Sequence, residues 1–282
     1  MPCRSIDAPF LTVIMTCMGR LHHLQQSLPM VANQTGLQVI VVDYGCPDRA
    51  GDWVQLHFDQ VRVVRAIGVT HFSVGKARNF GATHADTRWV CFLDADTLVG
   101  PDFASDLARS VRDRTFLLAD PCPNDLTGFV VCSLDDFKRI GGYDDLFSGW
   151  GAEDRDFYAR MERSGVARGV LPAQSIRVIH HGDSERTRYH DIPDRFVSLR
   201  INGMYLQIKT DLARLTEVLE LPANDRAAIY ERVRQLVLDH RDSAVKMDIN
   251  LPLDTEFSRP PGWQLRRTIS YVFEPSSDGR NA

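Results

Sequence analysis

Residues 141–158 combine residue types that acid–base chemistry and ligand binding both need. The stretch reads GGYDDLFSGWGAEDRDFY and contains an indole at Trp150 between two glycines, followed by the carboxylates Glu153, Asp154 and Asp156. A carboxylate can act as a general base. Acids in the first turn of a helix are also stabilised by its free N–H groups and macrodipole. Two interpretations therefore stand: a catalytic acid cluster, or an ordinary capped helix start.

A second acidic pair follows the apolar run that begins at Trp89. The sequence WVCFLDADTLV places Asp94 and Asp96 at the end of a predicted buried strand. In open α/β sheets, ligands bind at the carboxyl ends of strands. Two aspartates there could hold Mn²⁺ or Mg²⁺, which share oxygen ligands with substrate phosphates. The alternative is a solvated turn.

Strands and helices alternate through the first half of the chain, which predicts βαβ units and a parallel sheet that becomes mixed after Thr115. We expect strands at Phe10–Met15, Gln38–Asp43, Val61–Ala66, Trp89–Asp94, Thr115–Ala119, Gly128–Ser133 and Ser175–His180. We expect helices near 20–33, 50–58, 74–86, 101–112, 134–140 and 153–164.

The last third of the chain carries fewer residues suited to chemistry. Two amphipathic helices are expected at 194–210 and 225–240, with Asn224 or Asp225 capping the second. The end, from Pro260 onward, has turn and disorder signals. We expect this third to be a packing appendage, with acceptor or partner binding as alternatives.

Composition points to an ordinary globular protein. Hydrophobic residues are 44% of the chain, charged residues 25%, and the net charge is −4, which argues against nucleic-acid binding. No apolar stretch is long enough to cross a bilayer, and the N-terminus lacks the apolar core of a signal peptide. Cysteines in or beside strands, without a CxxC pair, suggest reduced thiols. We expect a cytoplasmic protein, at most peripheral to the inner membrane face.

Taken together, these segments resemble the GT-A class of nucleotide-sugar glycosyltransferases. The resemblance covers roughly residues 10–190 and rests on the ordered blocks TVIMTCMGR, VIVVDYGCPD, GKARNFGATHA, CFLDADTLV and LDDFKRIGGYDDLFSGWGAEDRDFYARM. Order and spacing match glycosyltransferase family 2, and the Gly-Trp-Gly-Glu-Asp signature is shared with β-1,4-galactosyltransferases and bacterial chondroitin-type polymerases. The resemblance implies a mixed α/β sheet flanked by helices over residues 1–193. The nucleotide-sugar half would cover about 1–100 and the acceptor half about 101–193, with 194–282 as a helical extension.

For the donor nucleotide, the resemblance implies a pocket lined by Thr16, Arg20 and Asp43. Asp43 would contact uracil or ribose, or else start a turn with the glycine and proline that follow it. Arg20 suits diphosphate because its guanidinium donates two hydrogen bonds at once. Lys76 and Arg78 could each meet the nucleotide, but they cannot be assumed to do so together, since helix neighbours two apart point differently. One or both could instead lie on a solvated helix face.

For the metal, the resemblance implies that Asp96 contacts Mn²⁺ directly and that Asp94 contacts ribose or metal-bound water. A late histidine would add a ligand, and the pattern favours His181 over His180. Neighbouring residues in a strand face opposite ways, so one of the two is expected to point at the metal.

For catalysis, the resemblance implies an inverting transfer with Asp154 as the base, although Glu153 remains an alternative. Glu153 would otherwise orient the acceptor or a loop, and Asp156 would be a helix-face or capping residue. Trp150 could stack on a sugar ring or anchor the core, and Gly151 would let its loop close and exclude water.

These assignments predict a metal-dependent hexosyltransferase that uses a UDP-sugar and a saccharide or glycolipid acceptor, in bacterial surface polysaccharide synthesis. A sugar-nucleotidyltransferase is an alternative, although TCMGRLHH is a poor version of the loop it needs. A degenerate domain that binds nucleotide-sugar or saccharide without turnover is the second alternative. Donor sugar, linkage and oligomeric state are not predicted.

Overall fold

The computed structural model describes residues 8–120, 126–172, 174, 176–241, 245–252 and 268–275. These residues belong to two compact units, Met1–Arg195 and Phe196–Ala282. In the described residues, none of the helices has both the length and the apolar character that spanning a bilayer requires.

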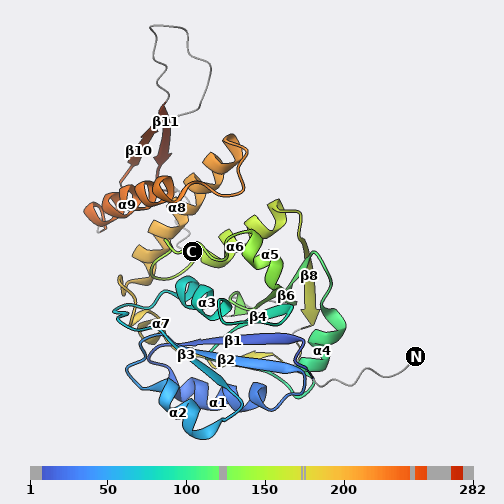
Figure 1. Ribbon diagram of the computed structural model, residues 1–282. Helices are drawn as coiled ribbons and strands as arrows, with labels where there is room; N and C mark the ends of the chain where they lie inside the picture. The colour runs from blue at the N-terminus through green and yellow to red at the C-terminus, as the bar shows by residue number, and fades with distance from the viewer. Residues whose placement is uncertain are drawn as a thin grey trace. The chain divides into compact units, whose positions relative to one another are not determined.

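A seven-stranded sheet forms the centre of the first unit, in the order β3-β2-β1-β4-β7-β6-β8 (Figure 1). The strands β3, β2, β1 and β4 run parallel, β7 is antiparallel to both neighbours, and β8 is parallel to β6. The sheet is therefore mixed, as the sequence predicts. Its strands are β1 Leu11–Cys17, β2 Leu37–Asp43, β3 Arg62–Arg65, β4 Trp89–Asp94, β6 Thr115–Asp120, β7 Val130–Ser133 and β8 Ala167–Pro172.

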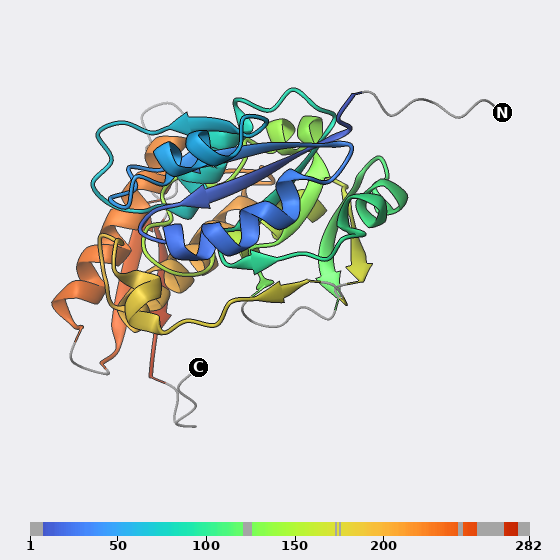
Figure 2. The same cartoon turned by 90° about the horizontal axis from the view of Figure 1, so that it is seen from below.

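Helices cover both faces of this sheet (Figures 1 and 2). Alternate residues of β1, beginning with Leu11 and Val13, pack in a buried core with residues from three helices on one face of the sheet. These helices are α1 Leu21–Ala32, α2 Ala50–His57 and α4 Phe103–Ser110. On the opposite face, Phe92 of β4 contacts Phe137 and Tyr143. That face carries α3 Val74–Ala82, α5 Leu134–Arg139 and α6 Glu153–Arg163.

The close approach of α3 to the sheet depends on Gly81. A Cβ atom at this position would lie 2.5 Å from Ile14 and 2.8 Å from Val42. Without it, α3 lies directly on β1 and β2, with Arg78 buried. The register pairs Thr16 with Asp94, so the carboxyl ends of β1 and β4 meet at one edge of the sheet.

Two very short strands bring a distant segment to the same edge. β5 Thr97–Leu98 pairs antiparallel with β9 Arg177–Val178, and the N–H of Ile179 donates to the carbonyl of Asp96 at 2.8 Å. The chain then enters the short helix α7 Asp183–Thr187. This pairing sets the position of residues 180–187 beside the end of β4.

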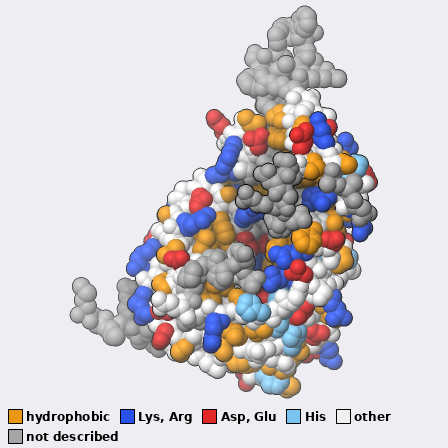
Figure 3. All heavy atoms as spheres, turned by 180° about the vertical axis from the view of Figure 1, so that it is seen from behind, with side chains coloured by type: hydrophobic (Ala, Val, Ile, Leu, Met, Phe, Trp, Pro, Cys, Tyr) orange, Lys and Arg blue, Asp and Glu red, His pale blue; other side chains and the backbone are white. Residues whose placement is uncertain are grey.

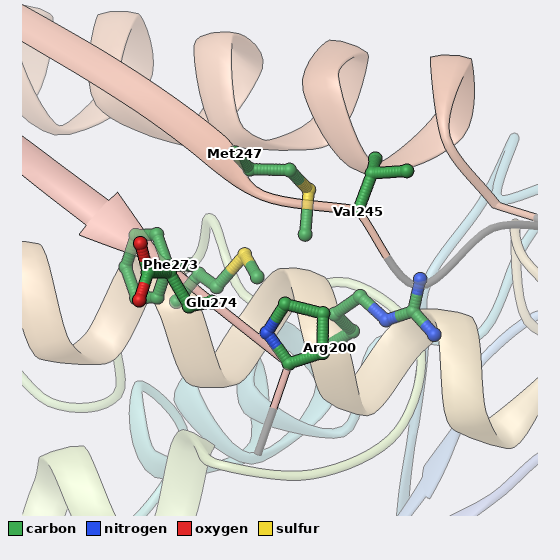
Figure 4. Close-up of a pocket in the computed structure, with 7 residues that line it drawn as sticks. Arg200, Val245, Met247, Phe273 and Glu274 are labelled. Atoms are coloured by element: carbon green, nitrogen blue, oxygen red, sulfur yellow. The ribbon is translucent and has the colours of Figure 1, made fainter. Parts of the chain in front are cut away.

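The second unit contains the helices α8 Arg195–Leu215 and α9 Ala223–Asp239 and a hairpin of β10 Met247–Pro252 with β11 Thr268–Phe273. A mainly apolar cavity of about 170 Å³ lies within it (Figure 4). Its lining is Arg200, Met204, Val245, Met247, Phe273, Glu274 and Pro275. The cavity holds no cluster of catalytic groups.

The helical extension expected at the C-terminus thus also contains a hairpin. Its second strand, TISYVF, lies in the region where the sequence indicated turns and disorder, and its alternating burial explains the strand. The expected cap of α9 is wrong: the N-cap is Pro222, with no side-chain hydrogen bond from Asn224 or Asp225.

In the first unit the expected strands and helices are present, with ends shifted by a few residues. The strand expected at Ser175–His180 is shorter, and Ser175 lies outside the described residues. Strands β5 and β8 and helix α7 were not predicted. The cysteines in and beside the strands are buried and free, as predicted: Cys17, Cys46, Cys91 and Cys132.

Candidate active site

A histidine and an aspartate meet where β4 ends and the segment after β9 returns. His181 Nε2 lies 2.7 Å from Asp96 Oδ2, and both side chains are more than nine-tenths buried. Arg20 reaches the same carboxylate, with Nη1 3.4 Å from Asp96 Oδ2. Burial opposes the charge, but the His181 hydrogen bond and Arg20 hold the pKa of Asp96 below its usual value. Asp96 is therefore an anion at neutral pH.

The neighbouring His180 is exposed. Of the two adjacent histidines, the structure thus places His181 against Asp96, because successive residues of an extended chain face opposite ways. A third group, the buried imidazole of His23 at the start of α1, joins them, and the three offer ligand atoms within 4.8 Å of one another. The Nδ1 atoms of His23 and His181 are buried without a hydrogen-bond partner among the described residues.

This donor set fits a divalent cation. One carboxylate and two imidazoles suit Mn²⁺ or Zn²⁺ better than Mg²⁺, which prefers oxygen ligands alone. His23 was not among the metal ligands predicted from the sequence. The only available signal was the His22-His23 pair directly after the first strand and its loop.

A buried arginine joins the other two carboxylates of interest. Arg78 Nη2 donates to Asp94 Oδ1 at 2.9 Å, and Nη1 donates to Asp154 Oδ1 at 2.7 Å. The guanidinium carbon lies 5.1 Å from the ring centroid of Tyr143. The Arg78 side chain is only 2% exposed, whereas Asp94 is 33% exposed. Arg78 therefore contacts the more exposed Asp94 from the protein interior.

Gly128 makes room for this arrangement. A Cβ atom there would lie 2.4 Å from Arg78 Nη2 and 2.6 Å from Asp94 Oδ2. Both distances are below any real Cβ contact, so a larger residue at position 128 would displace one partner of the ion pair.

Glu153 and Asp154 begin α6, and their environments differ. Burial and the nearby Asp154 raise the pKa of Glu153 to about 8, so this residue carries a proton at neutral pH. Burial also raises the pKa of Asp154, but Arg78 and a hydrogen bond from Glu153 oppose that shift. The helix N-terminus adds further positive potential. Within the pair, the contact with Arg78 favours the ionised form of Asp154.

The loop before α6 has an unusual backbone. Gly149, Gly151 and Ala152 all have positive φ, at 78°, 94° and 79°. Trp150 between them is half-buried, and Arg195 lies over its ring at 4.0 Å from the centroid. One face of the indole therefore packs against Arg195 rather than facing open solvent. A positive φ at a non-glycine residue stores strain, which is common at ligand-binding loops.

The remaining acid of this stretch, Asp156, is structural. It forms a buried ion pair with Arg160, whose Nη1 donates to the carbonyls of Ile140 and Gly142 at 2.8 Å. The ion pair therefore attaches the turn at Gly141 and Gly142 to α6. Asp156 lies in the first turn of α6, where the sequence predicts a helix-face or capping residue.

The residues expected around the nucleotide separate into two groups. Thr16 is buried at the end of β1, and Arg20 is beside Asp96. Asp43 instead accepts backbone N–H bonds on both oxygens, from Cys46 at 2.8 Å and Gly51 at 3.0 Å. Its carboxylate holds the turn after β2, which is the turn role that the sequence also allowed.

The two cations of α3 point in different directions, as their spacing predicts. Lys76 is exposed, whereas Arg78 is buried and donates to Asp94 and Asp154. Figure 3 shows several histidine side chains gathered on one part of the molecular surface.

Two family models match overlapping parts of the chain. The glycosyl transferase family 2 model matches residues 12–123, and the model of the N-terminal domain of galactosyltransferase matches residues 115–183. The boundary between them falls near the point where the sheet turns from parallel to mixed.

Curated relatives are also glycosyltransferases. Validoxylamine A glucosyltransferase of Streptomyces hygroscopicus subsp. jinggangensis is 23% identical, over 77% of this chain and 70% of that protein. The enzyme of the same name from subsp. limoneus is 23% identical, over 77% of this chain and 65% of its own length.

Solved structures with a similar fold include the following two. Staphylococcus aureus TarS in complex with UDP has a TM-score of 0.54 at 15% identity, over 81% of this chain and 72% of that one. The mannosyltransferase PcManGT of Pyrobaculum calidifontis, in complex with GDP-Man and Mn²⁺, has a TM-score of 0.53 at 16% identity, over 80% and 69%. The chain is a glycosyltransferase of the GT-A type, which confirms the predicted fold and enzyme class.

Proposed function

We propose that the chain is a metal-dependent, inverting hexosyltransferase. It would move a hexose or N-acetylhexosamine from a UDP-sugar to a hydroxyl of a saccharide or glycolipid, in bacterial surface polysaccharide synthesis. The observation that carries this proposal is the placement of Asp94, Asp96 and Asp154. Arg78 ties Asp154 to Asp94, and Asp96 lies two residues further along beside His181.

Asp96 and His181, with His23 beside them, are the residues that would hold the cation. A bound Mn²⁺ would supply positive charge that stabilises the departing nucleoside diphosphate. Arg20 contributes a guanidinium at the same place, and its fork geometry suits bidentate contacts with phosphate oxygens. The relatives in complex with UDP and with GDP-Man and Mn²⁺ support a nucleotide-sugar donor.

Asp154 is the proposed general base. Arg78 and the N-terminus of α6 keep it ionised, while its burial raises its pKa and so its strength as a base. Glu153, protonated at neutral pH, could donate a hydrogen bond to Asp154 and so help to orient it. A hydroxyl held within hydrogen-bond reach of Asp154 would lose its proton as it attacks the anomeric carbon from the side opposite the diphosphate.

Trp150 and Gly151 are proposed to bind the acceptor and to exclude water. The indole of Trp150 could stack on a sugar ring, and the positive-φ backbone on both sides allows the loop to change shape. Excluding water matters because hydrolysis of the donor competes with transfer.

The adjacent histidines provide a matched test of the cation site. Thermal stabilisation by UDP-sugars and GDP-sugars would be measured with Mn²⁺, with Mg²⁺ and with EDTA, since ligands that bind only the native state raise its apparent stability. His181→Ala should lose the Mn²⁺-dependent part of the stabilisation, and His180→Ala should retain it. Equal behaviour of the two variants, with the fold intact, would contradict the assignment of the cation to Asp96 and His181.

A further inference from the structure

Two adjacent histidines at the start of α1 point at one carboxylate of α7. His22 Nε2 lies 3.0 Å from Glu185 Oε1, and His23 Nε2 lies 3.5 Å from the same oxygen. The two imidazole centroids are 4.1 Å apart. The three side chains offer ligand atoms that all lie within 4.8 Å of one another.

The shared oxygen has no hydrogen bond. Glu185 Oε1 is buried and lacks a hydrogen-bond partner among the described residues, although two ring nitrogens are close to it. Burying an unsatisfied carboxylate oxygen is costly, and native structures rarely leave one. Two nitrogens that approach one oxygen without hydrogen-bond geometry could instead surround a common ion.

The spacing agrees with such a centre. Ligand atoms about 2.0–2.2 Å from a metal ion lie roughly 3.0–3.5 Å apart in tetrahedral or octahedral geometry. The distances of 3.0 and 3.5 Å between the nitrogens and Glu185 Oε1 are in this range. His22 is 57% exposed, so an ion has a path from solvent and room for water ligands.

We propose that His22, His23 and Glu185 bind a transition-metal ion, with Zn²⁺ as the best match, at a site separate from Asp96 and His181. Two imidazoles and one carboxylate suit Zn²⁺ and Co²⁺, whereas Mg²⁺ needs oxygen ligands. The bound ion would tie α7 to α1. Because α7 directly follows His181, the ion would also restrain the segment that carries this residue.

The proposal does not rest on glycosyl transfer, because metal binding can be measured without donor or acceptor. His23 also lies near Asp96 and His181. The competing account is therefore that His23 serves only the donor cation, and that His22 and Glu185 have no metal role. Variants at His22 and at Asp96 separate the two accounts.

The test is isothermal titration of the EDTA-stripped full chain with Zn²⁺, and separately with Co²⁺ to record its visible spectrum. The Asp96→Asn background removes the donor-cation carboxylate. In that background, one Zn²⁺ should still bind, and adding His22→Ala or Glu185→Gln should weaken it by at least about 10–100-fold. His57→Ala, which removes an exposed histidine on α2, should leave the affinity unchanged. Circular dichroism checks that each variant is folded.

A second readout follows from the bridge between the helices. Zn²⁺ should raise the melting temperature of the Asp96→Asn protein but not of Asp96→Asn with His22→Ala. Zinc affinity equal in the His22→Ala and His57→Ala proteins would overturn the proposal. So would complete loss of zinc binding on Asp96→Asn alone, because it would leave one site only.

Discussion

Replacing Arg78 by methionine tests whether this buried guanidinium stabilises the carboxylates of the site. The methionine keeps much of the side-chain volume but removes a guanidinium that is 2% exposed and bonded to two carboxylates at 2.7 and 2.9 Å. Removing one partner of a buried ion pair costs about 3–5 kcal/mol, because the other charge remains buried without compensation. We therefore expect Arg78→Met to lower the free energy of unfolding by about that amount at pH 7.5.

The loss should depend on pH in a definite direction. Burial already raises the pKa of Asp154 above its usual value, and without Arg78 this pKa rises further. Carboxyls of this kind bind more protons in the folded state, so stability falls as pH rises through the folded pKa. The difference between variant and wild type should therefore be smaller at pH 5 than at pH 7.5.

The assay is urea denaturation followed by tryptophan fluorescence at both pH values. The matched control is Arg88→Met, which removes an ion pair with Asp113 whose side chains are 64% and 69% exposed. Such a surface pair contributes at most about 1 kcal/mol. A loss for Arg78→Met that equals the control, or that is the same at both pH values, would refute the reasoning.

Two further outcomes follow from the same cluster. Gly128→Ala should separate Arg78 from Asp94, because the added Cβ would overlap both side chains. We expect the unfolding free energy to fall by about 1–3 kcal/mol and donor binding to weaken. Wild-type stability and donor affinity in this variant would contradict the expectation. Glu153→Gln should become more stable relative to wild type as pH rises from about 5 to 9. In the wild-type protein the pKa of Glu153 is raised to about 8, so the folded state loses stability as this carboxyl ionises through that range. The gain, on the order of 1–3 kcal/mol, is read from denaturation curves at several pH values, and a pH-independent difference would show that Glu153 is already ionised.

The central fold could be predicted from sequence because its signals are local. Apolar runs that end in aspartate, such as WVCFLD, predict a buried strand and the edge where ligands bind. The short strand β5 could not be predicted, since two residues carry no periodicity, and its partner β9 is shorter than the strand expected there. Their pairing is nonetheless what brings His181 to Asp96.

The site was only partly predictable, for a related reason. Spacing predicts that Lys76 and Arg78 point apart, but not which of them is buried, because this depends on how closely α3 approaches the sheet at Gly81. His23 was missed because its role depends on contacts with residues more than seventy positions away in sequence, such as Asp96. Block order, in contrast, placed Asp154 at the start of a helix, as observed.

The most direct test of the account compares Asp154→Asn with wild type in sugar transfer and in donor binding. We predict that transfer falls by about 10²–10⁴-fold, the usual contribution of a general base, while Mn²⁺-dependent donor binding remains close to wild type. Asp135→Asn, an exposed acid on α5, is the control and should transfer normally. A folded Asp154→Asn protein that transfers sugar at the wild-type rate would contradict the assignment of Asp154 as the base.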